Sequence, residues 1–305
     1  MADVRVEAFA KVNLGLRVLY RRPDGFHELR TVFQTISLAD KLEVTYRPGP
    51  GIEVELSCNL PELAGPDNLA ARAARRLLET AGAGGRVRIH VEKRIPVGAG
   101  LGGGSSDAAA VLKALAARIR PRPDARLLRQ VAAELGSDVA FFLLGGRALG
   151  LGRGDEVYPL PDGPARWLVV AAPSFSVSTA EAYRLLSRDL TTAAAHDKIY
   201  RFGSAIWASE RGPAEDFAAG MENDFESVVF GLHPELQILK ARLGRLGARP
   251  ALLCGSGSAV LGLCADRRQA LRVRDSANGK GVRCLAARTI GRRRYEARWR
   301  RWLRA

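Results

Sequence analysis

The stretch PVGAGLGGGSSDAAA, residues 96–110, places five glycines within seven positions and continues directly into alanines. Glycine loses more conformational freedom on folding than any other residue, so such a cluster is costly unless the backbone must be strained or closely approached. The segment VRIHVEK (87–93) before it alternates as a strand does, and alanine is a strong helix former. The sequence therefore predicts a strand, a glycine loop and a helix from about Ser105 to Arg118.

A glycine loop that opens a helix predicts a site for an anion. Successive glycine N–H groups and the positive end of the helix dipole form a cradle for phosphate, and Ser105 and Ser106 add hydroxyl donors. The loop also satisfies the pattern GxGxxG, but the dinucleotide fingerprint needs an acidic residue at the end of the next strand, whereas Asp124 is expected to begin a helix. No Gly-Lys-Ser/Thr follows, which excludes a Walker loop. A turn capped by Ser105 would need only one or two glycines, so phosphate binding is favoured.

The remaining periodicity predicts an α+β fold. In the first half, strands are expected at 4–20, 31–47, 52–57 and 87–93, and helices from Asp67 or Asn68 to Thr80 and over 124–135. The proline-rich stretch YPLPDGPAR (158–166) is the best candidate for a domain boundary. Beyond it we expect strands at 167–173 and 282–285, two short strands around a Gly-Ser-Gly turn in 251–264, and helices from Ser178 or Thr179, at 222–230 and at 234–247. The segment 190–220 is polar and poorly patterned.

The net charge of +15 raises the possibility of a nucleic-acid partner. Only seven of the 47 basic residues are lysine, and the arginines are spread along the chain, which indicates compositional bias; no nucleic-acid partner is expected. The densest cluster is the tail GRRRYEARWRRWLRA (291–305), in which Tyr295, Trp299, Trp302 and Leu303 follow helical spacing. We expect this helix to dock on the protein through its aromatic side chains. A surface for a membrane, an acidic partner or another subunit is the alternative.

The sequence predicts a cytoplasmic protein without a membrane span. The N-terminus lacks the basic start and apolar core of a signal peptide, and the longest apolar runs, at 139–144 and 167–172, are too short to cross a bilayer. The four cysteines are widely spaced and form no CxxC pair, so we expect buried free thiols, with neither a disulfide framework nor a zinc site.

The glycine segment PVGAGLGGGSSDAA resembles the nucleotide-binding signature of the GHMP kinase superfamily, which includes galactokinase, homoserine kinase and mevalonate kinase. GSGSA at 255–259 resembles the third glycine motif of that family. The segments at 10–40, 66–79 and 135–146 resemble one branch of it, which phosphorylates a cytidine-diphosphate-linked acceptor in the non-mevalonate route to isoprenoids. The resemblance covers about residues 5–290.

The resemblance implies a two-domain architecture. Residues 1–160 would form an N-terminal domain similar to the second domain of ribosomal protein S5, with the ATP-binding glycine loop. Residues 161–290 would form a C-terminal α+β domain, and 291–305 a basic tail. The sequence does not decide the oligomeric state between a monomer and a homodimer.

The resemblance also implies ATP as the phosphoryl donor, with its phosphates along the glycine loop, which comprises Pro96, Val97, Gly98, Ala99, Gly100, Leu101, Gly102, Gly103, Gly104, Ser105 and Ser106. Mg²⁺ is expected because ATP chemistry needs it, and it prefers substrate phosphates plus one or two protein ligands. Ser105, Ser106 and Asp107 are near enough in sequence to be considered, and the sequence does not choose among them.

Two residues are candidates for catalysis. From its pattern alone, Lys11 in an alternating strand would face solvent, and Asp138 before an apolar run would cap a helix. The resemblance implies instead that Lys11 meets the transferring phosphoryl group and that Asp138 is the general base for the acceptor hydroxyl.

The resemblance places the small-molecule acceptor among five side chains, Asn13, Phe26, His27, Thr179 and Tyr183. Phe26 stands where the family usually has tyrosine, so ring stacking is retained and a phenolic hydrogen bond is lost. Tyr183 would be the second stacking ring. Two alternatives remain, a family member acting on homoserine, mevalonate or a sugar, and a non-catalytic basic protein that binds nucleic acid. The second leaves the glycine loop unexplained.

Overall fold

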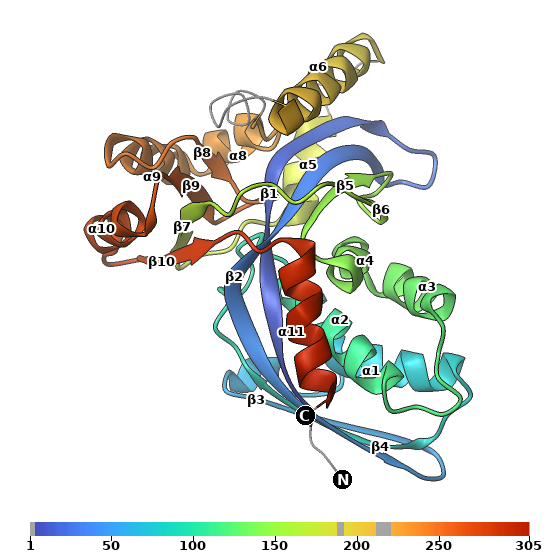
Figure 1. Ribbon diagram of the computed structural model, residues 1–305. Helices are drawn as coiled ribbons and strands as arrows, with labels where there is room; N and C mark the ends of the chain where they lie inside the picture. The colour runs from blue at the N-terminus through green and yellow to red at the C-terminus, as the bar shows by residue number, and fades with distance from the viewer. Residues whose placement is uncertain (1–3, 188–191, 212–220, 305) are drawn as a thin grey trace.

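The computed structural model describes residues 4–187, 192–211 and 221–304, which are built around two β-sheets (Figure 1). The first sheet has the order β3-β4-β2-β5-β6, and β1 pairs with β2. All its pairs are antiparallel except β3 with β4. Its strands are β1 (Val4–Arg21), β2 (His27–Pro48), β3 (Ile52–Cys58), β4 (Gly85–Glu92), β5 (Arg147–Leu151) and β6 (Glu156–Pro159).

Helices cover this sheet and bury alanine-rich faces against it. Asn68, one of the two residues expected at the start of this helix, caps α1 by accepting a hydrogen bond from the Ala70 N–H. Asp124, which the sequence places at the start of α3, caps that helix by accepting from the Leu127 N–H. The helices of this layer are the short 3₁₀ turn η1 (Pro61–Leu63), α1 (Leu69–Thr80), α2 (Gly103–Ala116), α3 (Ala125–Leu135), α4 (Ser137–Leu144) and, from the end of the chain, α11 (Arg292–Arg304).

The second sheet is antiparallel, in the order β10-β7-β9-β8. Its strands are β7 (Trp167–Pro173), β8 (Ala251–Leu253), β9 (Val260–Cys264) and β10 (Val282–Arg288). The stretch 158–166 joins the last strand of the first sheet to the first strand of the second. The accompanying helices are α5 (Thr179–Leu186), α6 (Thr192–Arg211), α8 (Glu226–Leu232), α9 (Pro234–Arg245) and α10 (Arg267–Ala277).

The long hairpin of β1 and β2 connects the two layers (Figure 1). Phe9 packs into the alanine-rich core beneath the helices, and Leu16 and Leu29, near the tip, pack into the core around α8 and α9. Between them, Val12 and Ile36 pack against the second sheet. One strand pair therefore contributes to three apolar cores. Hairpin side chains that belong to none of these cores, such as Lys11 and Asn13, lie where the two halves of the chain meet.

The basic C-terminal helix docks as its spacing predicts. In α11, Tyr295 and Trp299 are buried in the core of the first layer, and the Tyr295 hydroxyl donates to the Phe142 carbonyl at 2.5 Å. The Trp302 ring stacks on Phe9 at 6.1 Å between centroids. The side chain of Leu303 lies outside the described part of the structure.

Several expectations about the elements need correction. Residues 192–211 form α6 although their sequence shows no clear pattern, because Lys198 ties this helix to the Val18 carbonyl and to Asp224. Positions 212–220 lie outside the described residues. The helix expected at 222–230 begins only at Glu226, and β5 and β6 were not predicted at all.

The cysteines and the helices bear on two further expectations. All four cysteines are free, as predicted; Cys254, Cys264 and Cys284 are buried, and Cys58 is only partly so. Among the described helices, none combines the length and the apolar character that crossing a membrane requires.

Candidate active site

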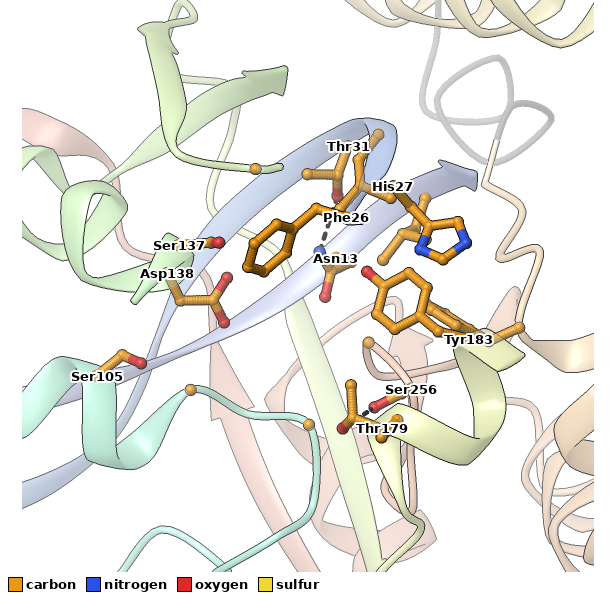
Figure 2. Close-up of a pocket in the computed structure, with 18 of the residues that line it drawn as sticks. Asn13, Phe26, His27, Thr31, Ser105, Ser137, Asp138, Thr179, Tyr183 and Ser256 are labelled. Atoms are coloured by element: carbon orange, nitrogen blue, oxygen red, sulfur yellow. Dashed lines mark hydrogen bonds between the residues drawn. The ribbon is translucent and has the colours of Figure 1, made fainter. Parts of the chain in front are cut away.

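A cleft of about 810 Å³ opens where the two halves of the chain meet (Figure 2). Its walls come from the β1–β2 hairpin, the glycine loop, the start of α4, helix α5 and the turn after β8. This volume is typical of sites for small molecules. Most of the predicted site residues line it, namely Lys11, Asn13, Phe26, His27, Gly100, Gly102, Ser105, Asp138, Thr179 and Tyr183.

Lys11 does not face solvent as strand alternation alone would suggest. Its side chain is only 5% exposed, because β1 is covered on both faces and irregular pairing around Lys11 and Asn13 turns both side chains toward the cleft. The Lys11 ammonium donates to Asn13 Oδ1 at 2.8 Å, and its Nζ lies 3.5 Å from Asp138 Oδ2. The site thus holds a buried cation next to a carboxylate.

Asp138 is not the helix cap that its sequence context favours. The cap position of α4 is Gly136, and Asp138 lies in the first turn, where the N-terminal end of the helix dipole favours a negative charge. The side chain is 29% exposed and extends into the cleft (Figure 2). A partly hydrated carboxylate is thereby held against Lys11.

A relay of side chains fixes the orientation of Asn13. Its Nδ2 donates to Thr31 Oγ1 at 2.8 Å, and the Thr31 hydroxyl donates to the Gly15 carbonyl at 2.8 Å. Asn13 Oδ1 is therefore directed at Lys11. Thr31 could not be identified from the sequence, since only the pairing of β1 with β2 brings it next to Asn13.

The glycine loop needs its glycines for two physical reasons. Gly98, Gly100 and Gly102 have φ values of +67°, +75° and +68°, a region that other residues rarely adopt. A Cβ on Gly100 would lie 1.9 Å from the Cys254 carbonyl oxygen, so the turn after β8 can pack here only against glycine. The Ala259 N–H also donates to the Ala99 carbonyl at 3.2 Å. The second glycine motif thus packs directly against the first.

The start of α2 leaves backbone donors available. The first hydrogen bond within the helix runs from the Ser106 N–H to the Gly102 carbonyl, so the N–H groups of residues 103–105 have no acceptor inside the helix. The Ser106 hydroxyl is not available, because it donates to the Phe9 carbonyl at 2.7 Å. The other predicted loop residues surround this cradle: Ala99 and Leu101 are buried, Pro96 and Gly103 are partly exposed, and Val97, Gly98 and Gly104 are exposed.

We expect Gly100→Ala to lower the free energy of unfolding by about 1–3 kcal/mol or more, because the new methyl group must displace a backbone carbonyl and strain a positive φ. Gly104→Ala is the matched control, since its Cβ would meet nothing within 4 Å and its φ is not positive. Urea unfolding measures both. Equal stability of the two variants would contradict the proposed close packing.

A cluster of buried charged side chains lies next to the glycine loop. Lys93 pairs with Asp40 and with Asp107 Oδ2, the second at 2.8 Å, and Asp40 Oδ1 also accepts from the Ile95 N–H at 2.8 Å. Burial raises the pKa of Asp107 to about 8. Because its Oδ2 pairs with Lys93 and the residue does not line the cleft, Asp107 is not in reach of a bound ion there. The Ser105 hydroxyl is then the accessible oxygen among the three residues considered for Mg²⁺. Within the described residues, no three His, Cys, Asp or Glu side chains converge on a metal site.

The opposite end of the cleft is aromatic. Phe26, in the turn between β1 and β2, is 52% exposed, and the Arg153 guanidinium covers one face of its ring at 4.8 Å. His27 stacks on Tyr183 of α5 with centroids 4.7 Å apart, and burial lowers the pKa of His27, with a further contribution from Arg21. Figure 2 shows Phe26 and Tyr183 extending into the cleft from these separate elements.

Two contacts join α5 to the turn after β8. The Thr179 and Ser256 hydroxyls share a hydrogen bond at 2.8 Å. Asn223, which is buried, donates through its amide to the carbonyls of Leu253 and Gly255 and so fixes the turn. The sequence indicated the glycines of this turn but not Asn223, whose role depends on distant pairing.

A glycine loop at the start of a helix, without a Walker lysine but close to a buried lysine and a carboxylate, is typical of one class of protein, the small-molecule phosphotransferases. The model for the GHMP kinase N-terminal domain matches residues 68–146, and that for the C-terminal domain matches residues 205–283. A 4-diphosphocytidyl-2-C-methyl-D-erythritol kinase from Solibacter usitatus is 49% identical over 97% of this chain and 92% of its own length. A kinase of the same name from Moorella thermoacetica is 45% identical over 90% of this chain and 94% of its own length.

The chain belongs to the GHMP kinases and, within them, to the family of 4-diphosphocytidyl-2-C-methyl-D-erythritol kinases. A crystal structure of a 4-(cytidine 5'-diphospho)-2C-methyl-D-erythritol kinase superposes with a TM-score of 0.76 at 39% identity, covering 94% of this chain and 99% of the other. A homoserine kinase from Cytophaga hutchinsonii shares the fold, with a TM-score of 0.74 at 19% identity. The family membership and the α+β fold expected from the sequence are confirmed. Membership in a kinase family implies ATP as the phosphoryl donor.

Proposed function

We propose that this protein transfers the γ-phosphoryl group of ATP to the 2-hydroxyl of 4-diphosphocytidyl-2-C-methyl-D-erythritol, in the methylerythritol phosphate route to isoprenoid precursors. The single observation that carries this proposal is the meeting of Lys11 and Asp138, 3.5 Å apart, in a cleft with a glycine loop on one side and aromatic rings on the other.

In the proposed reaction, Asp138 Oδ2 accepts the proton of the acceptor hydroxyl as its oxygen attacks the γ-phosphorus. Lys11 holds an oxygen of the transferring group and neutralises charge as the bond to the β-phosphate breaks. The free N–H groups of residues 103–105 hold the phosphates of ATP, and the Asn13–Thr31 relay keeps the Lys11 ammonium in place. Each group lies on a different element, and the cleft brings them together.

Mg²⁺ fits a site of this kind as a companion of ATP. Among the residues that line the cleft, Asp138 supplies the one carboxylate and Ser105 a hydroxyl near the glycine loop. A single carboxylate is too few for a resident metal centre, which agrees with the preference of Mg²⁺ for substrate phosphates and water. When bound, the ion would supply charge neutralisation at the phosphates. Ser105 is the side chain that we propose as its nearest protein ligand.

The cytosine of the acceptor is proposed to lie between the exposed face of Phe26 and Tyr183. Stacking on an aromatic ring contributes about 1–3 kcal/mol per base. We therefore expect Tyr183→Leu to raise KM for the cytidyl substrate by about tenfold or more and to leave KM for ATP unchanged. Tyr158→Leu, at an exposed tyrosine outside the cleft, is the control. An unchanged KM for the cytidyl substrate in Tyr183→Leu would remove this ring from the binding site.

The hydrogen bonds of His27 fix which of its nitrogens can accept. The Ser187 hydroxyl donates to the Tyr183 carbonyl at 2.6 Å, so His27 Nε2 must donate to that hydroxyl, at 2.6 Å. In the neutral ring Nδ1 is then an acceptor, suited to the amino group of cytosine.

This arrangement predicts a pH dependence. The pKa of His27 is lowered from 6.5, so the ring stays neutral down to that pH and loses its acceptor only as the pH falls further. KM for the cytidyl substrate is expected to be constant from about pH 8 to 6.5 and to rise below it. In His27→Phe, which keeps a ring but has no acceptor, KM should be raised at every pH and show no such dependence. A wild-type KM that stays flat to pH 5 would refute this role.

A phosphotransfer assay tests the proposed function. Purified protein is incubated with ATP, Mg²⁺ and one acceptor at a time: the cytidyl substrate, homoserine, mevalonate and galactose. ADP should form rapidly only with the cytidyl substrate. Faster turnover of another acceptor would support the alternative family member.

A further inference from the structure

A second cavity of about 670 Å³ lies outside the active-site cleft and shares no lining residue with it. It is bounded by the end of α2, the start of α3, the C-terminal half of α4 and the start of β6. Its volume is within the range of small-molecule sites. Its floor is apolar, formed by Ala116, Leu128, Ala140, Leu143, Leu144 and Val157.

The charges around this floor are unbalanced. Of the two lining carboxylates, Asp155 pairs with Arg153 at 2.6 Å, and Asp124 caps α3 by accepting from the Leu127 N–H at 2.7 Å. Asp124 is therefore the one lining carboxylate that forms no ion pair with the described residues, against three lining cations. Arg122 and Arg129 also line the cavity, and neither forms an ion pair with any residue in the ranges that the structure describes. Two guanidinium groups therefore remain available at the edge of an apolar surface.

Lys113 adds a third cation at the inner wall. Its ammonium lies 4.6 Å from the ring centre of Tyr295 and 4.4 Å from that of Trp299, and 3.4 Å from the Leu143 carbonyl oxygen. No carboxylate pairs with it among the described residues. Loss of hydration lowers the pKa of Lys113 to about 7, although Glu296 acts in the opposite direction. An anion nearby would supply the counter-charge that this group lacks.

We propose that this cavity binds a small amphipathic anion, with an apolar body against the leucines and a phosphate or carboxylate head among Arg122, Arg129 and Lys113. The apolar floor offers no hydrogen bonds to a free ion such as phosphate, and the guanidinium groups at its edge would bind an anionic head more strongly than a neutral one. The site is separate from the phosphoryl-transfer cleft, so the proposal does not depend on the function assigned above.

Isothermal titration of the full-length protein with three probes of equal chain length tests this proposal: hexyl phosphate, hexanoate and hexanol. At least one of the two anions should bind saturably, more weakly as salt is added, while hexanol should not bind in the same range. The anion that binds more tightly identifies the head group.

A matched pair of variants locates the binding. Arg129→Glu should weaken it by about tenfold or more, because it replaces a charged donor with a like charge. Arg126→Glu, one turn earlier on α3 and outside the cavity lining, should change it by less than about twofold. Both positions are exposed, and circular dichroism verifies the fold. Binding that falls equally in both variants, hexanol that binds as tightly as the anions, or no binding by either anion would overturn the proposal.

Discussion

Replacing Asp138 with asparagine is expected to lower kcat by about 10²–10⁴-fold. Asparagine preserves the shape of the side chain but cannot accept the proton of the acceptor hydroxyl. The carboxylate lies 3.5 Å from Lys11 and is partly exposed, so its neutralisation should leave the fold and the glycine loop in place. Steady-state kinetics with the cytidyl substrate, together with direct titration of ATP, would separate lost chemistry from lost binding.

Asp67→Asn is a suitable control for this variant, because Asp67 is exposed beside the start of α1 and takes no part in the cleft. Its kcat should equal that of the wild type. A folded Asp138→Asn enzyme with near-normal kcat would show that the base is another group. If Asp138→Asn binds ATP weakly but has a normal kcat at saturating ATP, Asp138 contributes to nucleotide binding and not to catalysis.

The second large effect is expected at Lys11. Lys11→Met should lower kcat by about 10³-fold, because methionine fills similar space and supplies no charge to the transferring phosphoryl group. The same change leaves Asn13 Oδ1 without its donor, so a loss of stability of about 1–3 kcal/mol is also expected. Thermal unfolding and kinetics are therefore both needed.

Lys41→Met provides the comparison. Lys41 lies on β2, in the same sheet, but is exposed and does not line the cleft. Neither its kcat nor its stability should change appreciably. If Lys11→Met retains normal kcat after correction for the fraction folded, the lysine is structural only, and the phosphoryl group must be neutralised by other means.

The glycine loop was predictable from sequence because its physical demands are local. Positive φ at Gly98, Gly100 and Gly102 requires glycine, and the alanines that follow specify α2. The starts of α1 and α3 also reflect short-range preferences: Asn68 was one of two candidates for the first, and Asp124 was expected at the second. The stripe of Tyr295 and Trp299 belongs to the same group, since helical spacing alone predicts one buried face.

The remaining features depend on contacts between distant segments. The alternation of residues in β1 suggested that Lys11 faces solvent. This was wrong, because β1 is covered on both faces and Lys11 is buried. The cap position expected at Asp138 is occupied by Gly136, two residues earlier, and α4 begins at Ser137. Thr31 and Asn223 act through hydrogen bonds to residues that only the folded chain brings near. The roles of Lys11 and Asp138 themselves came from resemblance, and the cleft supports them as proposals.

The docking of α11 has a consequence for biosynthesis. β1 is synthesised long before α11, yet it belongs to a core that also needs Tyr295 and Trp299 of that helix. While translation continues, Phe9 and its neighbours therefore lack their final cover. We expect nascent chains truncated before residue 291 to engage chaperones and to resist proteolysis poorly, because they lack the two rings that complete this core.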